Sequence, residues 1–159
     1  MCGYEQFMRR AIELARQTSI DDKAGGPFGC VIVKDGEIIG EGANRVIADC
    51  DPTSHGEMNA IRAASKTLGT HDLSGCTVFT SGEPCPMCYA ACSWARVDAI
   101  YFASTIRDAT EFGDFDDEAM SKSIQVPIQE RDLAGSELLR NEMLEIWKEY
   151  STLPDKQLY

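Results

Sequence analysis

The residues with the clearest chemical potential are His55 and Glu57, in the stretch TSHGEMNA, and Cys85 and Cys88, in SGEPCPMC. Imidazole and thiolate groups are the donors that Zn²⁺ prefers. Pro84 is suited to the start of a helix, where free N–H groups and the helix dipole stabilise thiolates. Three protein donors, His55, Cys85 and Cys88, would leave the fourth tetrahedral position of the metal open to water, which is the arrangement of a catalytic zinc site.

Glu57 indicates what such a site would do. The pattern His-x-Glu followed by Pro-Cys-x-x-Cys is typical of zinc deaminases, in which the glutamate carries protons and does not bind the metal. Zinc lowers the pKa of bound water towards about 7, so hydroxide is available at neutral pH. We expect zinc-bound hydroxide to attack the amino-bearing ring carbon while Glu57 acts as the proton shuttle. Residues two apart lie about 200° apart on a regular helix. His55 and Glu57 therefore converge only if a helix begins at this point.

Other interpretations of the same residues remain open. Ser54 and Glu57 fit a capping box, in which both side chains would bond only to the backbone at a helix start. Cys92 lies one helical turn after Cys88, so a closed structural zinc site of one histidine and three cysteines, in a non-catalytic module, is a second alternative. The Cys-x-x-Cys pair alone would also suit a redox site or half of a structural zinc site.

The composition limits the class of protein and its partners. The 159 residues suit one deaminase domain over residues 1–150, followed by a C-terminal tail over residues 151–159. The first residues do not resemble a signal peptide and no run of apolar residues is long enough to span a bilayer, so we expect a cytoplasmic protein without a membrane partner. In such a protein the seven cysteines favour burial or metal binding over disulfides. A formal net charge of −11 disfavours nucleic acid as a partner.

The elements that must position these residues can be predicted from hydrophobic periodicity and turn residues. Asp35-Gly36 lies between two apolar runs, which predicts a β-hairpin over residues 29–42. The strands and helices alternate, which favours an α/β fold with three layers, α/β/α, around a mixed sheet of about five strands. Helices are expected at about 4–17, 55–69, 85–95 and 139–150, further strands at 76–81 and 98–104, and an edge strand containing Pro127 at 124–128.

Several motifs together resemble the cytidine-deaminase-like zinc superfamily, and most of all its small bacterial-type guanine deaminase branch. They are GGPFG at 25–29, Asn44 after the hairpin, DPTSHGE at 51–57, SGEPCPMC at 81–88, WAR at 94–96, DFDD at 114–117 and an aromatic terminus at Tyr159. The resemblance implies a cytidine deaminase-like fold, Zn²⁺ as cofactor and hydrolysis of guanine to xanthine and ammonia. Alternative substrates are cytosine, guanosine, an aminotriazine and tRNA adenosine.

The resemblance also implies roles for residues outside the zinc motif. Phe28 and Trp94 would line the pocket for the base, and Asn44 would read the edge of its ring. A carboxylate of the DFDD stretch would face the exocyclic amine. Asp114 interrupts the usual order Gly-Phe-Asp-Asp of this branch, which leaves Asp116 and Asp117 as candidates, and Asp117 is favoured.

The end of the chain is expected to complete the site. In the resembling branch the terminal segment helps to close the active site, so Tyr159 is expected to contact the substrate. Pro154 makes the preceding connection stiff and extended. A homodimer in which the C-terminal tails are exchanged is therefore one expectation, and a tail that closes the site of its own chain is the other. A second departure from the branch, Gly56 in place of alanine, is shared with fungal-type cytosine deaminases.

Overall fold

The computed structural model describes residues 3–156. Contacts divide the chain into two compact units, Met1–Glu118 and Ala119–Tyr159. In chain order the first unit contains α1 (Tyr4–Arg16), the π-helical turn η1 (Gln17–Asp21), β1 (Gly29–Lys34), β2 (Glu37–Ala43), the short α2 (Val46–Asp49), α3 (Gly56–Leu68), β3 (Cys76–Gly82), α4 (Pro86–Trp94), β4 (Ala99–Ser104) and α5 (Ile106–Gly113). No helix in the described residues has the length and apolar character needed to span a membrane.

The sheet of the first unit has the strand order β2-β1-β3-β4. β1 pairs with β2 and with β3 in antiparallel orientation, whereas β3 and β4 are parallel. The predicted hairpin is confirmed as β1 and β2, and its turn residues Asp35 and Gly36 have φ angles of 52° and 83°. Positive φ at both positions is what a tight hairpin turn requires. The parallel pair β3–β4 is connected through α4, as the alternation of elements predicted.

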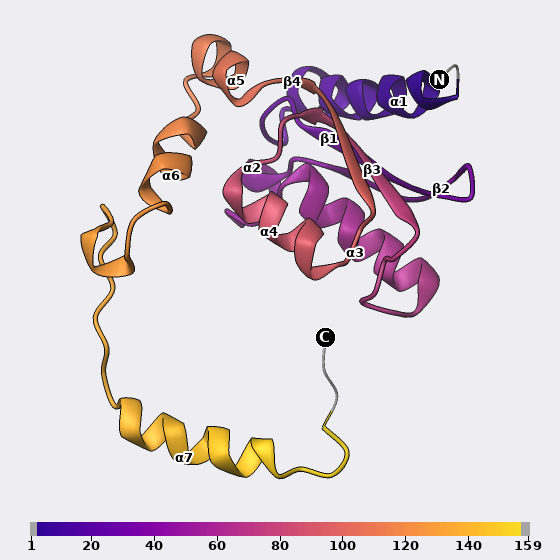
Figure 1. Ribbon diagram of the computed structural model, residues 1–159. Coiled ribbons are helices and arrows are strands. Elements are labelled where there is room, and N and C mark those ends of the chain that lie inside the picture. The colour runs from indigo at the N-terminus through magenta and orange to yellow at the C-terminus, as the bar shows by residue number, and fades with distance from the viewer. Residues whose placement is uncertain (1–2, 157–159) are drawn as a thin grey trace. The chain divides into compact units, whose positions relative to one another are not determined.

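Helices cover both faces of this sheet, which confirms the three-layer arrangement (Figure 1). Successive residues of β1 point to opposite faces, so Val31 and Val33 pack with Phe7 of α1, while Ile32 packs on the other side with Ala60 of α3. Both clusters consist of buried apolar side chains. The sheet is therefore a rigid support from which α3 and α4 present their N-termini.

α3 lies unusually close to β2 because the strand contributes glycines where the two elements cross. A Cβ atom on Gly40 would lie 2.6 Å from the carbonyl oxygen of Ala60, and one on Gly42 would collide with the backbone of Gly56 and Ala60. No side chain larger than hydrogen fits at either position without moving the helix. The first turn of α3, which carries His55 and Glu57, is fixed in this way against the sheet.

One prediction about the sheet needs correction. The sheet has four strands in the described residues, not about five, because residues 124–127 form an irregular turn and Ile128 begins a 3-10 turn, so the predicted edge strand at 124–128 is absent. The Arg131 guanidinium donates to the carbonyl oxygens of Val126 at 3.0 Å and of Ile124 at 3.3 Å, so these groups are bonded within a local loop. Helix α5 was not predicted from the sequence. This helix begins with a complete capping box, in which Thr105 and Asp108 each bond the other's backbone N–H.

The second unit continues from α6 (Asp117–Ser123), which crosses the boundary, to the 3-10 turn η2 (Ile128–Glu130) and α7 (Arg140–Ser151). α7 confirms the helix predicted at 139–150. None of its residues is buried, and Met143, Ile146 and Trp147 are 45%, 57% and 57% exposed. An apolar helix face of this size normally packs against another surface. The division into residues 1–150 and 151–159 stays a prediction.

Candidate active site

Three donor atoms from two helix N-termini lie together at one end of the sheet. The Nδ1 atom of His55 is 3.6 Å from the sulfur of Cys85 and 3.5 Å from the sulfur of Cys88. All three donor atoms lie within 4.8 Å of one another. Zn–N bonds of about 2.0 Å and Zn–S bonds of about 2.3 Å at tetrahedral angles put nitrogen and sulfur about 3.5 Å apart. The donor set and its spacing therefore fit a zinc ion.

The local folding of the chain explains why these donors converge. His55 is the N-cap residue of α3, with extended backbone angles of φ −77° and ψ 158°, and Cys85 holds the same position before α4, with φ −61° and ψ 166°. Pro86 occupies the first turn of α4, where its missing N–H costs nothing. Because His55 precedes the regular helix, it is not bound by the helical spacing, and its ring and the Glu57 side chain can face the same site.

The pKa values of the two cysteines shift in opposite directions. A hydrogen bond from the Cys88 thiol, followed by one from His55, lowers the pKa of Cys85 to about 4. The same hydrogen bond to Cys85, together with burial, raises the pKa of Cys88 above its usual value. The interaction with Cys85 likewise raises the pKa of His55. A divalent cation would displace the remaining protons, since zinc binds thiolate and neutral imidazole.

The Glu57 carboxylate lies beside this cluster and is almost completely buried, with 4% of the residue exposed. Burial is the main reason why its pKa is raised above the usual value. The hydroxyl group of Thr80, on β3, donates to the Oε1 atom of Glu57 at 3.3 Å. A buried carboxylate whose pKa lies closer to neutrality is suited to accept and return protons.

The structure also bears on the two alternatives for these residues. Ser54 is not a capping residue: its hydroxyl donates to the Asp49 carboxylate at 2.7 Å, and no side chain caps α3. The capping-box interpretation is therefore wrong. In the described part of the chain, the donor cluster consists of His55 and two cysteines and does not include Cys92. Cys92, which also lies on α4, is 1% exposed and packs in the hydrophobic core.

A second carboxylate comes from the start of α6. Asp117 is buried, with 9% of the residue exposed, whereas Asp116 is exposed. Burial, and then the negative charge at Cys85, raise the pKa of Asp117, while the charge of His55 lowers it. Asp117 therefore interacts electrostatically with two of the three donor residues, Cys85 and His55. Of the two candidates left open by the sequence, Asp117 is the one that is buried.

Comparison with known proteins shows to which family this chain belongs. The sequence model of the cytidine and deoxycytidylate deaminase zinc-binding region matches residues 1–104. The chain is 43% identical to guanine deaminase from Bacillus subtilis over 99% of both chains. The crystal structure of that protein superposes with a TM-score of 0.91, covering 98% of each chain. The chain belongs to the cytidine and deoxycytidylate deaminase zinc-binding family. Zinc is the cofactor of this family, and the donor set described above suits it.

Two more distant relatives match only part of the length. A tRNA-specific adenosine deaminase from Aquifex aeolicus is 38% identical over 64% of this chain and 66% of its own. The structure of guanine deaminase from Nitrosomonas europaea superposes with a TM-score of 0.64 at 34% identity, covering 70% of this chain and 63% of its own. Relatives in this zinc deaminase family thus include proteins named for a free base and proteins named for tRNA.

Two predicted substrate contacts lie on the loops before β1 and after β2. Asn44 is buried, and its Oδ1 atom accepts hydrogen bonds from the backbone N–H groups of Gly26 and Val46, both at 3.2 Å. This pair of donors fixes which end of the amide is oxygen, and leaves the Nδ2 amino group to act as a donor. Asn44 also binds the Phe28 loop through its backbone, because its N–H donates to the Phe28 carbonyl oxygen at 2.8 Å.

The structure does not bring Trp94, another predicted substrate contact, to the donor cluster. Trp94 is the last residue of α4, at the opposite end of the helix from Cys85. It is 59% exposed, and the Arg96 guanidinium lies over its ring at 5.7 Å. Tyr159 lies outside the described residues. The roles of Trp94 and Tyr159 stay predictions.

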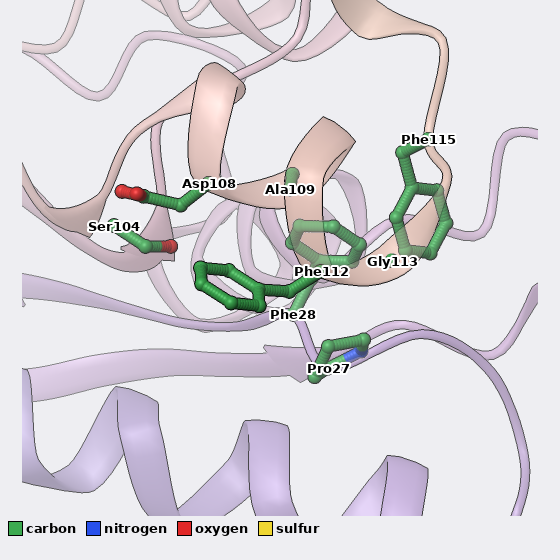
Figure 2. A pocket seen from close by; sticks show the side chains of 8 residues that line it. All are labelled: Pro27, Phe28, Ser104, Asp108, Ala109, Phe112, Gly113 and Phe115. Carbon is green, nitrogen blue, oxygen red and sulfur yellow. The ribbon is translucent and has the colours of Figure 1, made fainter.

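Sequence reasoning overlooked two residues of this site, Thr80 and Phe115. The alternation of β3 places Val78 and Thr80 on the face towards α3, which could have identified Thr80 as a polar residue facing the helix that carries Glu57. Phe115 lies within the quoted DFDD stretch. Its ring packs against that of Phe28, and both line a cavity of about 260 Å³ beside α5 (Figure 2).

Proposed function

We propose that this chain is a zinc-dependent guanine deaminase, which hydrolyses guanine to xanthine and ammonia. The observation that carries the proposal is a buried glutamate beside a three-donor zinc site in a chain related over its full length to guanine deaminase. The substrate class is a small free nucleobase. A net charge of −11 supports a free base over RNA, because phosphate contacts need positive charge.

The proposed chemistry divides between the metal and the side chains of this chain. Held by His55, Cys85 and Cys88, zinc would supply Lewis acidity, which brings the pKa of water to about 7 at comparable sites. Glu57 takes the proton released from water, delivers it to a ring nitrogen and then assists departure of the amino group as ammonia. Asp117 faces the exocyclic amine. Water and guanine together account for all atoms of xanthine and ammonia.

A screen of candidate substrates tests this proposal directly. Ammonia release should be measured for the purified, zinc-loaded chain with guanine, guanosine, cytosine, cytidine, adenine, small aminotriazines and a tRNA anticodon stem-loop. We expect guanine to give the highest kcat/KM. Turnover of another compound with guanine inert would overturn the choice of base and leave the zinc chemistry in place, whereas ammonia release from none of them would overturn the deaminase assignment.

Asn44 offers a sharp test of base recognition, because aspartate keeps the oxygen that binds Gly26 and Val46 and removes the Nδ2 donor. We expect Asn44→Asp to raise KM for guanine by roughly 5- to 150-fold, which corresponds to about 1–3 kcal/mol for an unpaired buried polar group. Folding should be preserved. Steady-state kinetics and thermal unfolding measure the two effects.

The matched control for this change is Asn141→Asp, which adds the same charge at an exposed position of α7. It should leave KM unchanged, so a similar increase in both variants would mean that charge alone is responsible. Asn44→Ala should differ from Asn44→Asp in stability, because it leaves the N–H groups of Gly26 and Val46 without their acceptor. An unaltered KM in Asn44→Asp would refute base recognition by this residue.

The proposal includes a cytoplasmic homodimer with exchanged C-terminal tails. The exposed apolar side chains of α7 support burial against another surface, and a homodimer is the commonest assembly. We expect deletion of residues 154–159 to leave zinc content and folding intact and to lower turnover sharply, because a lid excludes water from the substrate. Turnover and zinc content measure these effects, and full activity of the shortened chain would refute the lid.

Mixed dimers distinguish exchanged tails from tails that act on their own chain. Shortened chains carry an intact Glu57 but no tail, and Glu57→Gln chains carry a tail but no proton shuttle. Co-expression of the two should restore activity if each tail closes the partner's site. If each tail closes its own site, neither kind of site in the mixed dimer is complete, and the mixture should remain inactive.

A further inference from the structure

Phe115 connects two segments that carry proposed substrate contacts, the loop with Phe28 and the segment with Asp117. Its ring and the ring of Phe28 have centroids 5.0 Å apart with an interplanar angle of 76°, which is the favourable edge-to-face arrangement. Asp117 follows only two residues later in the chain. Phe115 thus touches one wall of the proposed base pocket and belongs to the segment that supplies its buried carboxylate.

Backbone on several sides restricts where the two rings can go. A Cβ atom on Gly26 would lie 2.8 Å from the Cζ atom of Phe115 and 3.0 Å from the Cε2 atom of Phe28. One on Gly82, at the end of β3, would lie 3.1 Å from two atoms of the Phe28 ring, and one on Gly113 would lie 2.6 Å from the Phe115 ring. The rings of Phe28 and Phe115 therefore pack directly on glycine backbone, and at these three positions no side chain larger than hydrogen fits beside them without a shift.

The backbone of Phe115 is also anchored. Thr110 donates from its hydroxyl group to the Phe115 carbonyl oxygen at 2.9 Å, and the Phe115 N–H donates to the Ala109 carbonyl oxygen at 3.4 Å. Asp114, with a φ angle of 56°, ends α5 and turns the chain back. The segment from Phe115 to Asp117 is therefore attached to α5 by hydrogen bonds and to the Phe28 loop by ring packing.

We infer that Phe115 is a positioning residue for substrate, which orients the Phe28 ring and sets the position of the Asp117 carboxylate. This inference rests on the proposed function for the identity of the substrate, and on the packing described above for the role of the ring. Removal of the ring abolishes the packing against Phe28, through which the segment that carries Asp117 is attached to the Phe28 loop. A misplacement of about 1 Å at a reacting group can cost roughly 100-fold in rate.

Phe115→Leu is the informative variant, because leucine keeps an apolar side chain and lacks the ring edge that meets Phe28. We expect kcat to fall about 10-fold or more through Asp117, a loss within the range that misplacement causes. KM should rise by roughly 5-fold or more through Phe28, the smaller of the losses seen when an aromatic contact to a base is removed. Zinc content should not change, since the ring contacts described above are to Phe28 and to glycine backbone and not to His55, Cys85 or Cys88.

Phe102→Leu is the matched control. Phe102 lies on β4, is 45% exposed and is not among the residues that line the cavity in Figure 2. It should retain the kinetics of the unchanged chain. Equal losses in the two variants, or no loss in Phe115→Leu, would overturn the positioning role.

A double variant separates positioning from general destabilisation. In an Asp117→Asn background, Phe115→Leu should cause little further loss in kcat while still raising KM, because the carboxylate it positions is already absent. An unchanged additional loss in kcat would overturn the link between Phe115 and Asp117.

A crystal structure of zinc-loaded Phe115→Leu gives a readout that does not depend on any substrate. The Phe28 ring and the Asp117 side chain should both be displaced, and unmoved positions would overturn the inference. If the unchanged chain fails to release ammonia from any base, the proposed function fails, and this structure still decides the role of Phe115.

Discussion

Replacement of Glu57 by glutamine should reduce turnover of guanine by about 10²- to 10⁴-fold, the usual contribution of general acid–base catalysis. Glutamine has nearly the same shape, and its amide oxygen can still accept the hydrogen bond from Thr80. It cannot take up a proton from water or return it to the substrate. Because burial raises the pKa of Glu57, the native carboxylate is suited to both steps, and its loss should affect kcat more than KM. Steady-state kinetics and zinc analysis measure the result.

Glu83→Gln is a suitable control for this variant. Glu83 lies two residues before Cys85, and its carboxylate accepts a hydrogen bond from the Ile106 N–H at 3.0 Å, which an amide oxygen can also accept. This variant should keep the turnover of the unchanged chain. Near-normal turnover in Glu57→Gln would show that the buried carboxylate has only a structural role, and loss of zinc in that variant would assign Glu57 to the metal.

Replacement of Cys88 by serine should abolish both zinc binding and activity. Cys88 is completely buried, and its sulfur lies 3.5 Å from the His55 nitrogen, so a serine hydroxyl in its place would leave the metal with two of the three donors. Serine does not ionise at neutral pH and is a poor zinc donor. Cys85→Ser should give the same result. Elemental analysis of the purified variants measures zinc content, and ammonia release measures activity.

Cys92→Ala is the control for the zinc experiment, because Cys92 is an equally buried thiol four residues further along α4. It should retain a single zinc ion and most of its activity, with a small loss of stability from the vacated core volume. Loss of zinc from Cys92→Ala would instead favour a closed structural site with four protein donors. Retention of zinc in both Cys85→Ser and Cys88→Ser would refute the donor assignment.

The metal-binding residues could be predicted because the sequence features that indicate them lie close together in the chain. Asp51-Pro52 before His55 and Pro84 before Cys85 indicate where two helices begin, and a helix N-terminus fixes the direction of the side chains around it. The same holds for the hairpin, whose Asp35-Gly36 turn sets the pairing of the residues next to it, up to a register shift between Ile32 and Val33. In these cases a few neighbouring residues carry the information.

Contacts between distant segments could not be predicted in the same way. Thr80 meets Glu57 only because of the register of β3 against α3, and Phe115 meets Phe28 across 87 positions of the sequence. The false strand at residues 124–128 has a local origin: its apolar pattern is typical of a strand, but Arg131, a few residues further along the chain, bonds its carbonyl groups. Helix α5 is different. Thr105 and Asp108 form a recognisable capping signal that periodicity alone does not reveal.

The close packing of β2 on α3 also bears on how the family acquires new substrates. Gly40 and Gly42 hold the helix that begins beside His55, and any side chain there would move a metal donor. The proposed substrate contacts Asn44, Phe28 and Asp117 lie on connecting segments or at a helix start, where sequence change is better tolerated. Selection can therefore alter the choice of base without disturbing the metal. A lineage built in this way can diverge in substrate while it retains one reaction, as relatives named for guanine and for tRNA adenosine illustrate.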